Sequence, residues 1–484
     1  MMDVVTSQGG AEISRCLLLS GGEWVAGEGP VSTVLDKYSL SQVAEAPAAS
    51  QAQIETMIAA AQDAFRADTL SPYQRGEILD RAVAMVAREK ESLARIIQLE
   101  SGFTKSDALG EVTRCMQTLS LSAEEARRLK GDVIPMSGAP NQGGRMGFTL
   151  RVPLGVVLAV TPFNSPLNTV THKVGPALAA GNAVILKPAS ATPMTSCKLA
   201  EILVEAGVPK GMLSVIHGGG DVVQSAIADQ RIRFIAFTGS TEVGRKIQQA
   251  AGLRRTQMEL GSIAYTILCD DADLDRALPK IVAAGYRKAG QVCTSVQMLL
   301  AHASIMEDVA ARMTDLVGKV KYGDPSIEGT VTGPLISEED AIRVEAWVEE
   351  AVEKGARRLV GGPRQGTVVP PTLLTGVTDD MKLGCSEIFG PVVCLKSFNS
   401  INEAIDLVNA TPYGLATGIF TNRLSDGLAA AKALEVGGVH INETSSSRID
   451  LMPYGGSKDS GFGREGPHYA VEEMTEERIV TIST

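Results

Sequence analysis

The stretch GVVLAVT, Gly155 to Thr161, is an apolar run of strand length that ends at a polar residue. Three more runs of the same kind follow it: NAVILKP from Asn182, LSVIHG from Leu213 and RFIAFTG from Arg233. Segments of helical pattern separate these runs. The alternation predicts right-handed βαβ crossovers and a parallel sheet covered by helices on both faces. On such sheets, ligands bind outside the carboxyl ends of the strands.

The pattern changes on either side of this region. Residues 51–128 read as long amphipathic helices, with a serine start signal at Ser71. Gly, Pro and Asn then punctuate two extended runs in GDVIPMSGAPNQGGRMGFTLRVP, which predicts a protruding hairpin. A second α/β region is predicted from about residue 265 to residue 454. The last residues, ERIVTIST, read as a lone strand that must pair with an edge, and an edge in another subunit is one solution.

The composition is that of a globular protein with an acidic balance. Of 484 residues, 44% are hydrophobic and 21% charged, and the formal net charge is −11. A chain of this length predicts two or three domains. It carries no basic run interleaved with aromatic residues, so we expect neither a nucleic-acid nor an anionic-membrane partner. No apolar stretch reaches membrane-spanning length, and CLLLS at Cys16 is too short for a secretory signal.

The seven cysteines are scattered, and no two form a CxxC pair. They predict neither a disulfide framework nor a zinc cluster, and they fit a reducing, cytoplasmic setting. The five histidines show no metal-ligand spacing, so no metal is expected. Cys293 lies between small uncharged neighbours in QVCTSVQ. For a single cysteine a core thiol is the commoner explanation, and a nucleophile is the functional one.

Four further segments carry polar groups where a site can form. In FTGSTEVGRKI, Gly239 and Ser240 precede a helix whose N-terminus suits a pyrophosphate, although a plain serine cap fits equally. Lys187 stands at the carboxyl end of a predicted strand, where it holds ribose or phosphate oxygens or is merely solvated. Asn164 lies in the proline-bracketed turn TPFNSP, where its amide can donate to an oxyanion; the alternative is that the turn has only a structural role. Glu259, in an apolar run, is either a general base with a raised pKa or simply paired.

Seven motifs occur in a fixed order along the chain: TPFNSP, KP, FTGSTEVG, ELG, GQVC, EIFGP and PYGGSKDSG. Together they resemble the NAD(P)-dependent aldehyde dehydrogenase superfamily, which shows TPxNxP, KP, FTGSxxxG, ELG, GQxC, E(I/V)FGP and PxGGxKxSG at these places. The resemblance covers the chain from about Gly21 to its end. The pattern is nearest to the branch that holds lactaldehyde, succinic semialdehyde and phosphonoacetaldehyde dehydrogenases.

The resemblance implies catalytic roles for three residues. Cys293 would attack the aldehyde carbon to form a thiohemiacetal, and loss of hydride to the nicotinamide would leave a thioester. Asn164, with the backbone N–H of Cys293, would stabilise the oxyanion. Glu259 would activate the water that hydrolyses the thioester, which argues against the acyl-CoA-forming branch.

The same resemblance implies a binding site for NAD or NADP. Lys187 and Glu387 would hold the ribose groups, and Phe389 would pack near the nicotinamide ribose. NAD-specific members carry a glutamate after the KP motif, whereas this chain has Ser190, so NADP is expected to be tolerated. The full set expected at the cofactor is Thr161, Pro162, Lys187, Ser190, Gly239, Ser240, Gly244, Leu260, Glu387 and Phe389.

Two departures from the family pattern bear on hydrolysis and substrate. Ser262, Ile263 and Ala264 follow ELG, where the family often continues with Gly and then Lys or Asn. That loop adjoins the predicted base, so the hydrolysis step is harder to infer than the acylation step. Ser165 stands where an aromatic residue commonly lines the substrate tunnel, so the tunnel wall should be wider or more polar there.

Two arginines point to the substrate. Arg114, on a helix that flanks the tunnel in the family, and Arg448, in the loop at its mouth, would bind a carboxylate, sulfonate or phosphonate, unless both are surface groups. The leading prediction is a small anionic or hydroxylated aldehyde, and the alternative is an aromatic aldehyde in a widened pocket. Two other classes stay open: a catalytically silent relative, and a thiol hydrolase that pairs Cys293 with His172 or His302.

The expected architecture is the aldehyde-dehydrogenase fold of the α/β class. A Rossmann-like dinucleotide-binding domain would comprise residues 15–130 and 153–258, and an α/β catalytic domain residues 259–455. The segments 131–152 and 470–484 would form a small β flap that pairs across subunits. This flap predicts a homodimer or a homotetramer.

Overall fold

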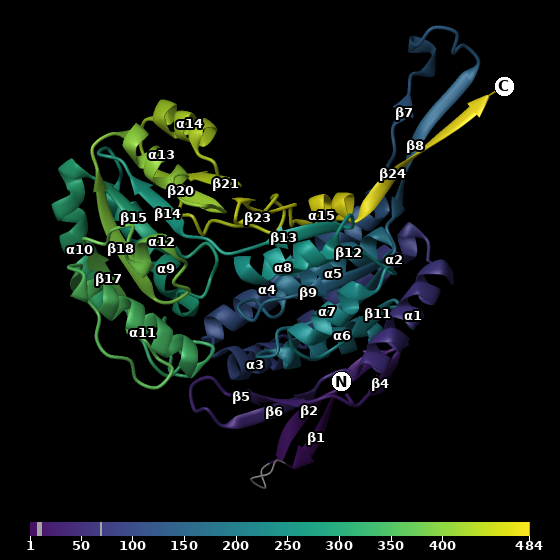
Figure 1. Cartoon of the computed structure of the whole chain (residues 1–484), viewed down its shortest axis with the longest axis horizontal. Coiled ribbons are helices and arrows are strands. Elements are labelled where there is room, and N and C mark those ends of the chain that lie inside the picture. Colours follow the sequence, from purple (N-terminus) through teal and green to yellow (C-terminus); the bar gives the residue numbers. More distant parts are fainter. Residues whose placement is uncertain (7–11, 68–69, 484) are drawn as a thin grey trace.

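The computed structural model describes residues 1–6, 12–67 and 70–483, so positions 68–69 and 484 of the segments predicted above lie outside the described residues. Five parallel strands form the centre of an eight-stranded sheet (Figure 1). They are β9 (Val156–Val160), β10 (Ala183–Lys187), β11 (Leu213–Val215), β12 (Ile232–Thr238) and β13 (Arg255–Glu259). Every residue of β9 and β10 is buried, which explains why these strands read as continuous apolar runs.

The strand order across this sheet is β23-β13-β12-β9-β10-β11-β3-β4. Two antiparallel strands, β3 (Leu18–Ser20) and β4 (Glu23–Val25), extend one edge, and β23 (Gly461–Phe462) pairs antiparallel with β13 at the other edge. The order in which the chain adds these parallel strands reverses at β9: β10 and β11 lie on one side of it, and β12 and β13 on the other. A sheet of this kind binds ligands at the carboxyl ends of the strands beside that reversal.

Right-handed crossovers around the reversal place α5 and α6 on one face of the sheet and α7 and α8 on the other. The predicted helical region is confirmed as four helices, and Ser71 caps the second of them in a capping box with Gln74. The helices of this half are α1 (Gln51–Ala67), α2 (Pro72–Arg88), α3 (Lys90–Ser101), α4 (Lys105–Arg128), α5 (Asn168–Ala180), α6 (Pro193–Glu205), α7 (Gly220–Ala228) and α8 (Thr241–Ala251).

The second predicted α/β region contains a seven-stranded sheet in the order β16-β17-β18-β15-β14-β20-β21. Its strands are parallel except for β16, which pairs antiparallel with β17. The strands are β14 (Ala264–Leu268), β15 (Val296–His302), β16 (Arg357–Val360), β17 (Thr372–Thr375), β18 (Val392–Phe398), β20 (Ala416–Phe420) and β21 (Gly438–Ile441). The helices are α9 (Leu274–Tyr286), α10 (Met306–Gly318), α11 (Glu338–Glu353), α12 (Lys382–Cys385), α13 (Ile401–Asn409) and α14 (Leu424–Ala433).

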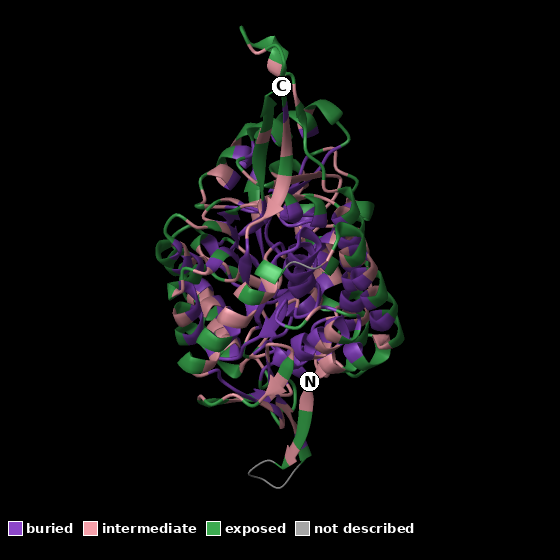
Figure 2. Ribbon diagram, turned by 90° about the vertical axis from the view of Figure 1, so that its right-hand side faces the viewer, coloured by how far each residue is buried: buried purple, intermediate pink, exposed green. Residues whose placement is uncertain are grey.

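A three-stranded arm projects from the body and carries the C-terminal end of the described chain (Figure 1). The predicted hairpin is present as β7 (Val133–Ile134) and β8 (Arg145–Pro153), and β24 (Thr475–Ser483) pairs with β8 over its whole length. The terminal strand therefore finds an edge within its own chain. Most of β24 is exposed, whereas the interior of the body is buried (Figure 2).

The remaining elements are small. A four-stranded sheet lies at the N-terminal side, and a two-stranded ribbon and a short helix precede the arm. They are β1 (Met2–Thr6), β2 (Glu12–Cys16), β5 (Val31–Leu35), β6 (Gln42–Pro47), β19 (Tyr413–Gly414), β22 (Ser457–Lys458) and α15 (Pro467–Glu473). Within the described ranges, no helix combines the length and the apolar character needed to cross a bilayer.

Candidate active site

The loop before β15 carries Cys293, and its backbone is unusually constrained. Lys288 and Ala289 adopt left-handed conformations, with φ of 51° and 53°, and Gly290 follows with φ of 68°. Each non-glycine residue in this region costs about 1–2 kcal/mol, so packing must hold the loop in place. A Cβ on Gly290 would collide with the backbone of Gly390, which explains the glycine of the GQVC motif. Packing therefore holds this loop, and with it the backbone of Cys293, in one conformation.

The Cys293 side chain is half-buried, and its Sγ lies 2.9 Å from the hydroxyl of Tyr454. Burial raises the pKa of the Cys293 thiol to about 12, and the hydrogen bond with Tyr454 acts in the opposite direction. The Arg448 guanidinium stacks over the Tyr454 ring at 3.7 Å from its centre. Tyr454 lies within the PYGGSKDSG motif, but nothing in that motif indicated a contact with the thiol.

Asn164 reaches the cysteine loop from the turn after β9. Its side-chain Nδ2 donates to the backbone oxygen of Gln291 at 2.8 Å, two residues before Cys293. A side-chain amide carries two N–H donors, so one can anchor the loop while the other donates to an oxyanion. The structure thus brings together two of the three predicted catalytic residues at the junction of the two sheets.

Glu259 is the last residue of β13 and is only 3% exposed. Neither of its carboxylate oxygens has a hydrogen-bond partner among the described residues. Burial raises the pKa of Glu259 well above its usual value, and the nearby Glu465 carboxylate adds to that rise. Glu465 is itself held ionised by Lys173 at 3.0 Å and Arg448 at 2.7 Å. A buried carboxyl without fixed partners is free to take a proton from water.

The predicted cofactor residues line the carboxyl edge of the first sheet. β10 ends at Lys187, and burial lowers the pKa of Lys187 to about 8. The Ser190 hydroxyl donates to the backbone oxygen of Gly218 at 3.1 Å. Ser240 caps α8, where its hydroxyl accepts from the Val243 N–H at 3.4 Å. The first turn of this eleven-residue helix offers N–H groups to an anion.

Two more of the predicted cofactor residues, Glu387 and Phe389, lie beside the cysteine loop. Glu387 accepts a hydrogen bond from the Ser262 N–H at 3.0 Å, and burial raises the pKa of Glu387 to about 7. Phe389 has φ of 47° and packs edge-on against Phe163 at 5.8 Å between ring centres. A narrow hollow borders Ser262, Glu387, Phe389 and the cysteine loop. Gly244 packs so closely on Leu260 that a Cβ would not fit.

These features fit a dinucleotide. The hydroxyls of Thr161 and Ser262 are buried and have no hydrogen-bond partner among the described residues, so both can serve a ligand. Lys187 is largely buried, and it makes no ion pair with any residue that the structure describes. Pro162 follows Thr161 in the same turn. A cationic lysine, free hydroxyls and a helix N-terminus suit ribose and phosphate oxygens.

Both predicted substrate arginines are ion-paired. Arg114 binds Asp450 with two hydrogen bonds of 2.7 and 3.2 Å, and the same carboxylate contacts His172 at 2.8 Å. Arg448 pairs with Glu465, as described above. Ser165 donates to the buried Glu111 at 2.8 Å. Their roles toward a substrate stay predictions.

Arg287 was missed in the sequence, where it reads as an ordinary residue at a helix end. Its Nη2 donates to the Ser446 hydroxyl at 2.8 Å, and Ser446 lies 3.3 Å from the hydroxyl of Thr294, next to Cys293. Within the described residues Arg287 forms no ion pair, unlike Arg114 and Arg448. Its positive charge therefore has no carboxylate partner among the described residues, and two hydrogen bonds connect it through Ser446 to the residue after Cys293.

The histidines of the hydrolase alternative do not contact Cys293. His172 is buried against Asp450, and burial lowers its pKa. His302 bonds the Asn399 carbonyl at 3.1 Å at the far end of β15.

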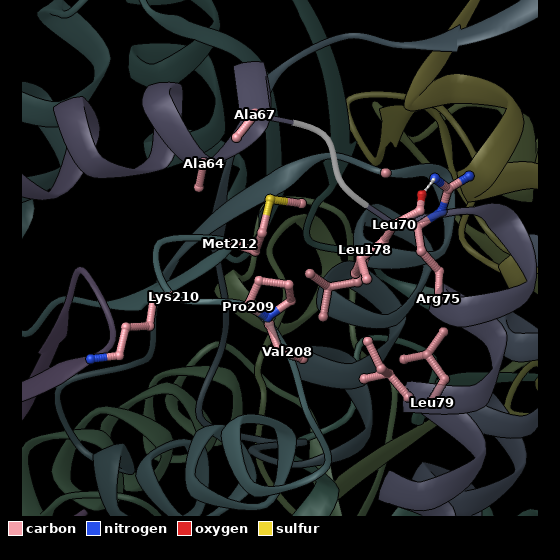
Figure 3. Close-up of a pocket in the computed structure, with 12 residues that line it drawn as sticks. Ala64, Ala67, Leu70, Arg75, Leu79, Leu178, Val208, Pro209, Lys210 and Met212 are labelled. Carbon is pink, nitrogen blue, oxygen red and sulfur yellow. Dashed lines mark hydrogen bonds between the residues drawn. The ribbon is translucent and has the colours of Figure 1, made fainter.

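An apolar pocket of about 100 Å³ lies away from the site, between α1, α2 and the segment before β11. It is lined by Ala64, Leu79, Leu178, Val208 and Met212 among others (Figure 3).

Comparisons with known proteins agree on one family. Residues 24–480 match the model of the aldehyde dehydrogenase family. The chain is 44% identical over 473 residues to a 3-sulfolactaldehyde dehydrogenase of Priestia aryabhattai, covering 98% of this chain and 99% of that protein. Aldehyde dehydrogenase 21 of Physcomitrella patens, solved with the product succinate, superposes with a TM-score of 0.94 at 36% identity, over 97% of this chain and 98% of that one. The NADP complex of the NADP-dependent glyceraldehyde-3-phosphate dehydrogenase of Bacillus halodurans gives 0.94 at 32% identity, over 97% and 99%.

Proposed function

Because the chain belongs to the aldehyde dehydrogenase family, as its seven motifs indicated, we propose that it oxidises a small anionic or hydroxylated aldehyde to the corresponding carboxylic acid with NAD(P)⁺. The observation that carries the proposal is a side-chain amide bonded to the loop of a hydrogen-bonded thiol, with a buried carboxyl near enough to raise the pKa of that thiol and without a hydrogen-bond partner among the described residues. These are Cys293, Asn164 and Glu259. All three groups are present, which speaks against a catalytically silent relative.

In the proposed reaction, Cys293 loses its proton and its sulfur adds to the aldehyde carbon, giving a thiohemiacetal. The Asn164 amide donates to the oxygen that gains negative charge. NAD(P)⁺, when bound, would supply the hydride acceptor that the oxidation of the thiohemiacetal to a thioester needs. Glu259 then removes a proton from a water that attacks the thioester, and the acid leaves as the Cys293 sulfur is released.

The cofactor is proposed to lie along the carboxyl ends of β9, β10 and β12. Lys187 would hold ribose oxygens, Glu387 would hold the nicotinamide ribose, and the N-terminus of α8 would face the pyrophosphate. Ser190 puts no carboxylate at the position after the KP motif, where a glutamate would repel a 2′-phosphate; the carboxylate that acts on Lys187 is that of Asp221, in the first turn of α7. The site is therefore expected to tolerate NADP in addition to NAD. An NADP affinity hundreds of times weaker than the NAD affinity would contradict this expectation.

An anionic substrate is supported by the charges around Cys293. Arg287 contributes a cation that pairs with no carboxylate of the described residues, and Arg114 and Arg448 lie in the same part of the molecule. A fork of N–H donors suits a sulfonate or carboxylate. The similarity to a sulfolactaldehyde dehydrogenase points the same way. An aromatic aldehyde remains the alternative, because the small side chain of Ser165 would leave a wider substrate tunnel.

The test is NAD(P)H formation by wild type and Cys293→Ala with 3-sulfolactaldehyde, lactaldehyde, succinic semialdehyde and benzaldehyde, each with NAD and with NADP. We expect anionic aldehydes to give the highest kcat/KM and the variant to lose turnover. A tenfold preference for benzaldehyde over succinic semialdehyde would favour the aromatic alternative. Tight cofactor binding without turnover of any aldehyde would contradict the enzyme function.

The arm is proposed to join subunits. Large apolar side chains of β7, β8 and β24 are exposed in the single chain: Val133, Met146, Leu150, Ile479 and Ile482. An exposed apolar strand edge is a surface that proteins usually cover. We therefore propose residues 131–152 and 470–484 as the oligomerisation flap, residues 15–130 and 153–258 as the cofactor domain and residues 259–455 as the catalytic domain.

A further inference from the structure

A buried ion pair that the reaction does not use lies directly behind the nucleophile loop. The Lys288 Nζ is 2.7 Å from a carboxylate oxygen of Glu111, and the two side chains are only 7% and 2% exposed. The ammonium also sits 4.4 Å from the centre of the Phe103 ring. Burying two charges is unfavourable unless close geometry and further hydrogen bonds compensate it. This pair has both.

The further hydrogen bonds of the pair all lead to the oxyanion turn. The Lys288 Nζ donates to the backbone oxygen of Asn164 at 3.2 Å. Glu111 accepts from the Ser165 hydroxyl at 2.8 Å and from the Asn168 N–H at 3.1 Å. Three segments that are remote in sequence therefore meet at two charged groups: helix α4, the turn between β9 and α5, and the loop before Cys293.

The two groups of the pair stabilise each other's charged form. Burial alone would raise the pKa of Glu111, but Lys288 and Arg114 hold that pKa below its usual value. Burial lowers the pKa of Lys288, and the Glu111 carboxylate opposes that change.

Lys288 is also the first residue of the left-handed segment that ends at Gly290. A lysine gains nothing from this backbone conformation, so its side-chain contacts must compensate the strain. The same residue thus fixes the backbone of the nucleophile loop and the backbone of Asn164. Those two backbones set the separation between the oxyanion donor and the Cys293 sulfur.

Resting on the proposed function, we propose that Lys288 and Glu111 are positioning residues that hold the Asn164 amide in register with Cys293. Neither touches the aldehyde. Their effect is on the geometry of the transition state, in which the amide must meet the new oxyanion. A misplacement of about 1 Å at such a site costs on the order of a hundredfold in rate.

The test compares Lys288→Met, Glu111→Gln and the double variant with wild type, using 3-sulfolactaldehyde as substrate. Each single variant leaves one buried charge without a partner and is at risk of misfolding, whereas the double variant removes both charges together. Lys319→Met, which breaks an exposed pair with Asp315 on α10, is the matched control. We expect kcat of the double variant to fall by about ten- to a hundredfold, with the KM values for aldehyde and cofactor within twofold.

Two further measurements separate positioning from a general loss of structure. The rate of Cys293 alkylation by iodoacetamide needs the thiol but no oxyanion donor, and it should stay within threefold of wild type in the double variant. Hydrogen exchange in a peptide covering residues 286–296 should become at least tenfold faster, while the Lys319→Met control matches wild type in all readouts.

Several results would overturn the inference. A folded double variant with unchanged kcat would do so, as would a parallel loss of alkylation and turnover, because the pair would then act on the thiol itself. If wild type turns over no aldehyde, the proposed function fails on its own account. Hydrogen exchange then still tests whether the pair holds the loop, and unchanged exchange would refute the pair's role.

Discussion

Burial raises the pKa of both Cys293 and Glu259, so each side chain holds its proton more tightly than it would in water. A protonated thiol is a poor nucleophile and a protonated carboxyl is no base. Turnover therefore requires each group to lose its proton at the step that uses it. Tyr454 favours deprotonation of the Cys293 thiol, because its hydroxyl can donate a hydrogen bond to the sulfur anion.

The first prediction concerns the alkylation of Cys293. With a pKa of about 12, the thiolate fraction grows about tenfold for each pH unit across the neutral and mildly alkaline range. The iodoacetamide rate of the cofactor-free protein should therefore rise from pH 7 to pH 10 without a plateau. Tyr454→Phe removes a hydrogen bond that lowers this pKa, so its rate should be about three- to tenfold lower at every pH. A plateau near pH 8, or an unchanged rate in the variant, would contradict these assignments.

The pH dependence of cofactor binding is the second prediction. The pKa of Lys187 is lowered to about 8 by burial, so the side chain loses its positive charge as the pH rises through that value. Affinity for NADP should consequently weaken several-fold between pH 7 and pH 9 in equilibrium titrations. Lys187→Ala should bind weakly at both pH values and lose the dependence. If wild type binds NADP equally tightly at pH 7 and pH 9, Lys187 does not contribute its charge to cofactor binding.

Sequence alone reaches the motif residues but not their contacts. Cys293, Asn164 and Glu259 stand in recognisable motifs at strand ends, so the local pattern and the resemblance suffice to name them. Tyr454 meets Cys293 across 161 residues, and Lys288 meets Glu111 across 177. Such contacts depend on how both sheets pack, and no local periodicity encodes them. The ion pairing of Arg114 and Arg448 was hidden for the same reason.

Among the secondary-structure elements, the arm shows what the sequence can and cannot tell. Turn residues predicted the hairpin, and the last residues, ERIVTIST, were predicted to be a lone apolar strand. The full pairing of β24 with β8 was not foreseen, because strand partners are set by the tertiary fold. The apolar side chains of the arm remain exposed in one chain, which leaves them for a neighbour.

A charge on the arm should therefore reduce the assembly state. Ile479 on β24 is 56% exposed, and Ile479→Glu would place a carboxylate within the proposed subunit contact. Light scattering of the purified variant should give a smaller mass than wild type at micromolar concentration. Ile327→Glu, at a residue 62% exposed outside the arm, is the control and should keep the wild-type mass. Equal masses for all three proteins would show that this part of β24 makes no subunit contact.

For the molecule as a whole, the fold class followed from the sequence because strands and helices alternate in both halves. The two sheets are joined by the few residues between β13 and β14, so Glu259 lies where the chain leaves one sheet for the other. A cofactor bound at the first sheet would contact this junction. Ligand binding should then stabilise the folded protein as a whole.

The size of that stabilisation can be stated. NADP at a hundred times its Kd adds about 2.7 kcal/mol, which corresponds to a rise in melting temperature of about 3 °C if all 484 residues unfold together. Lys187→Ala at the same NADP concentration should lose most of the rise. Differential scanning fluorimetry measures both, and a wild-type shift below 1 °C at a concentration that saturates turnover would contradict the proposed placement of the cofactor.

The pairing of β23 with β13 also bears on how the protein is made. The ribosome completes β13 about 200 residues before it adds Gly461, which at 5–20 residues per second is a delay of about 10–40 s. During that interval the nascent sheet has an open edge at Glu259, and the carboxylate of Glu465 that pairs with Lys173 does not yet exist. The catalytic pocket is therefore among the last parts of the protein to close, and chains released early would lack it.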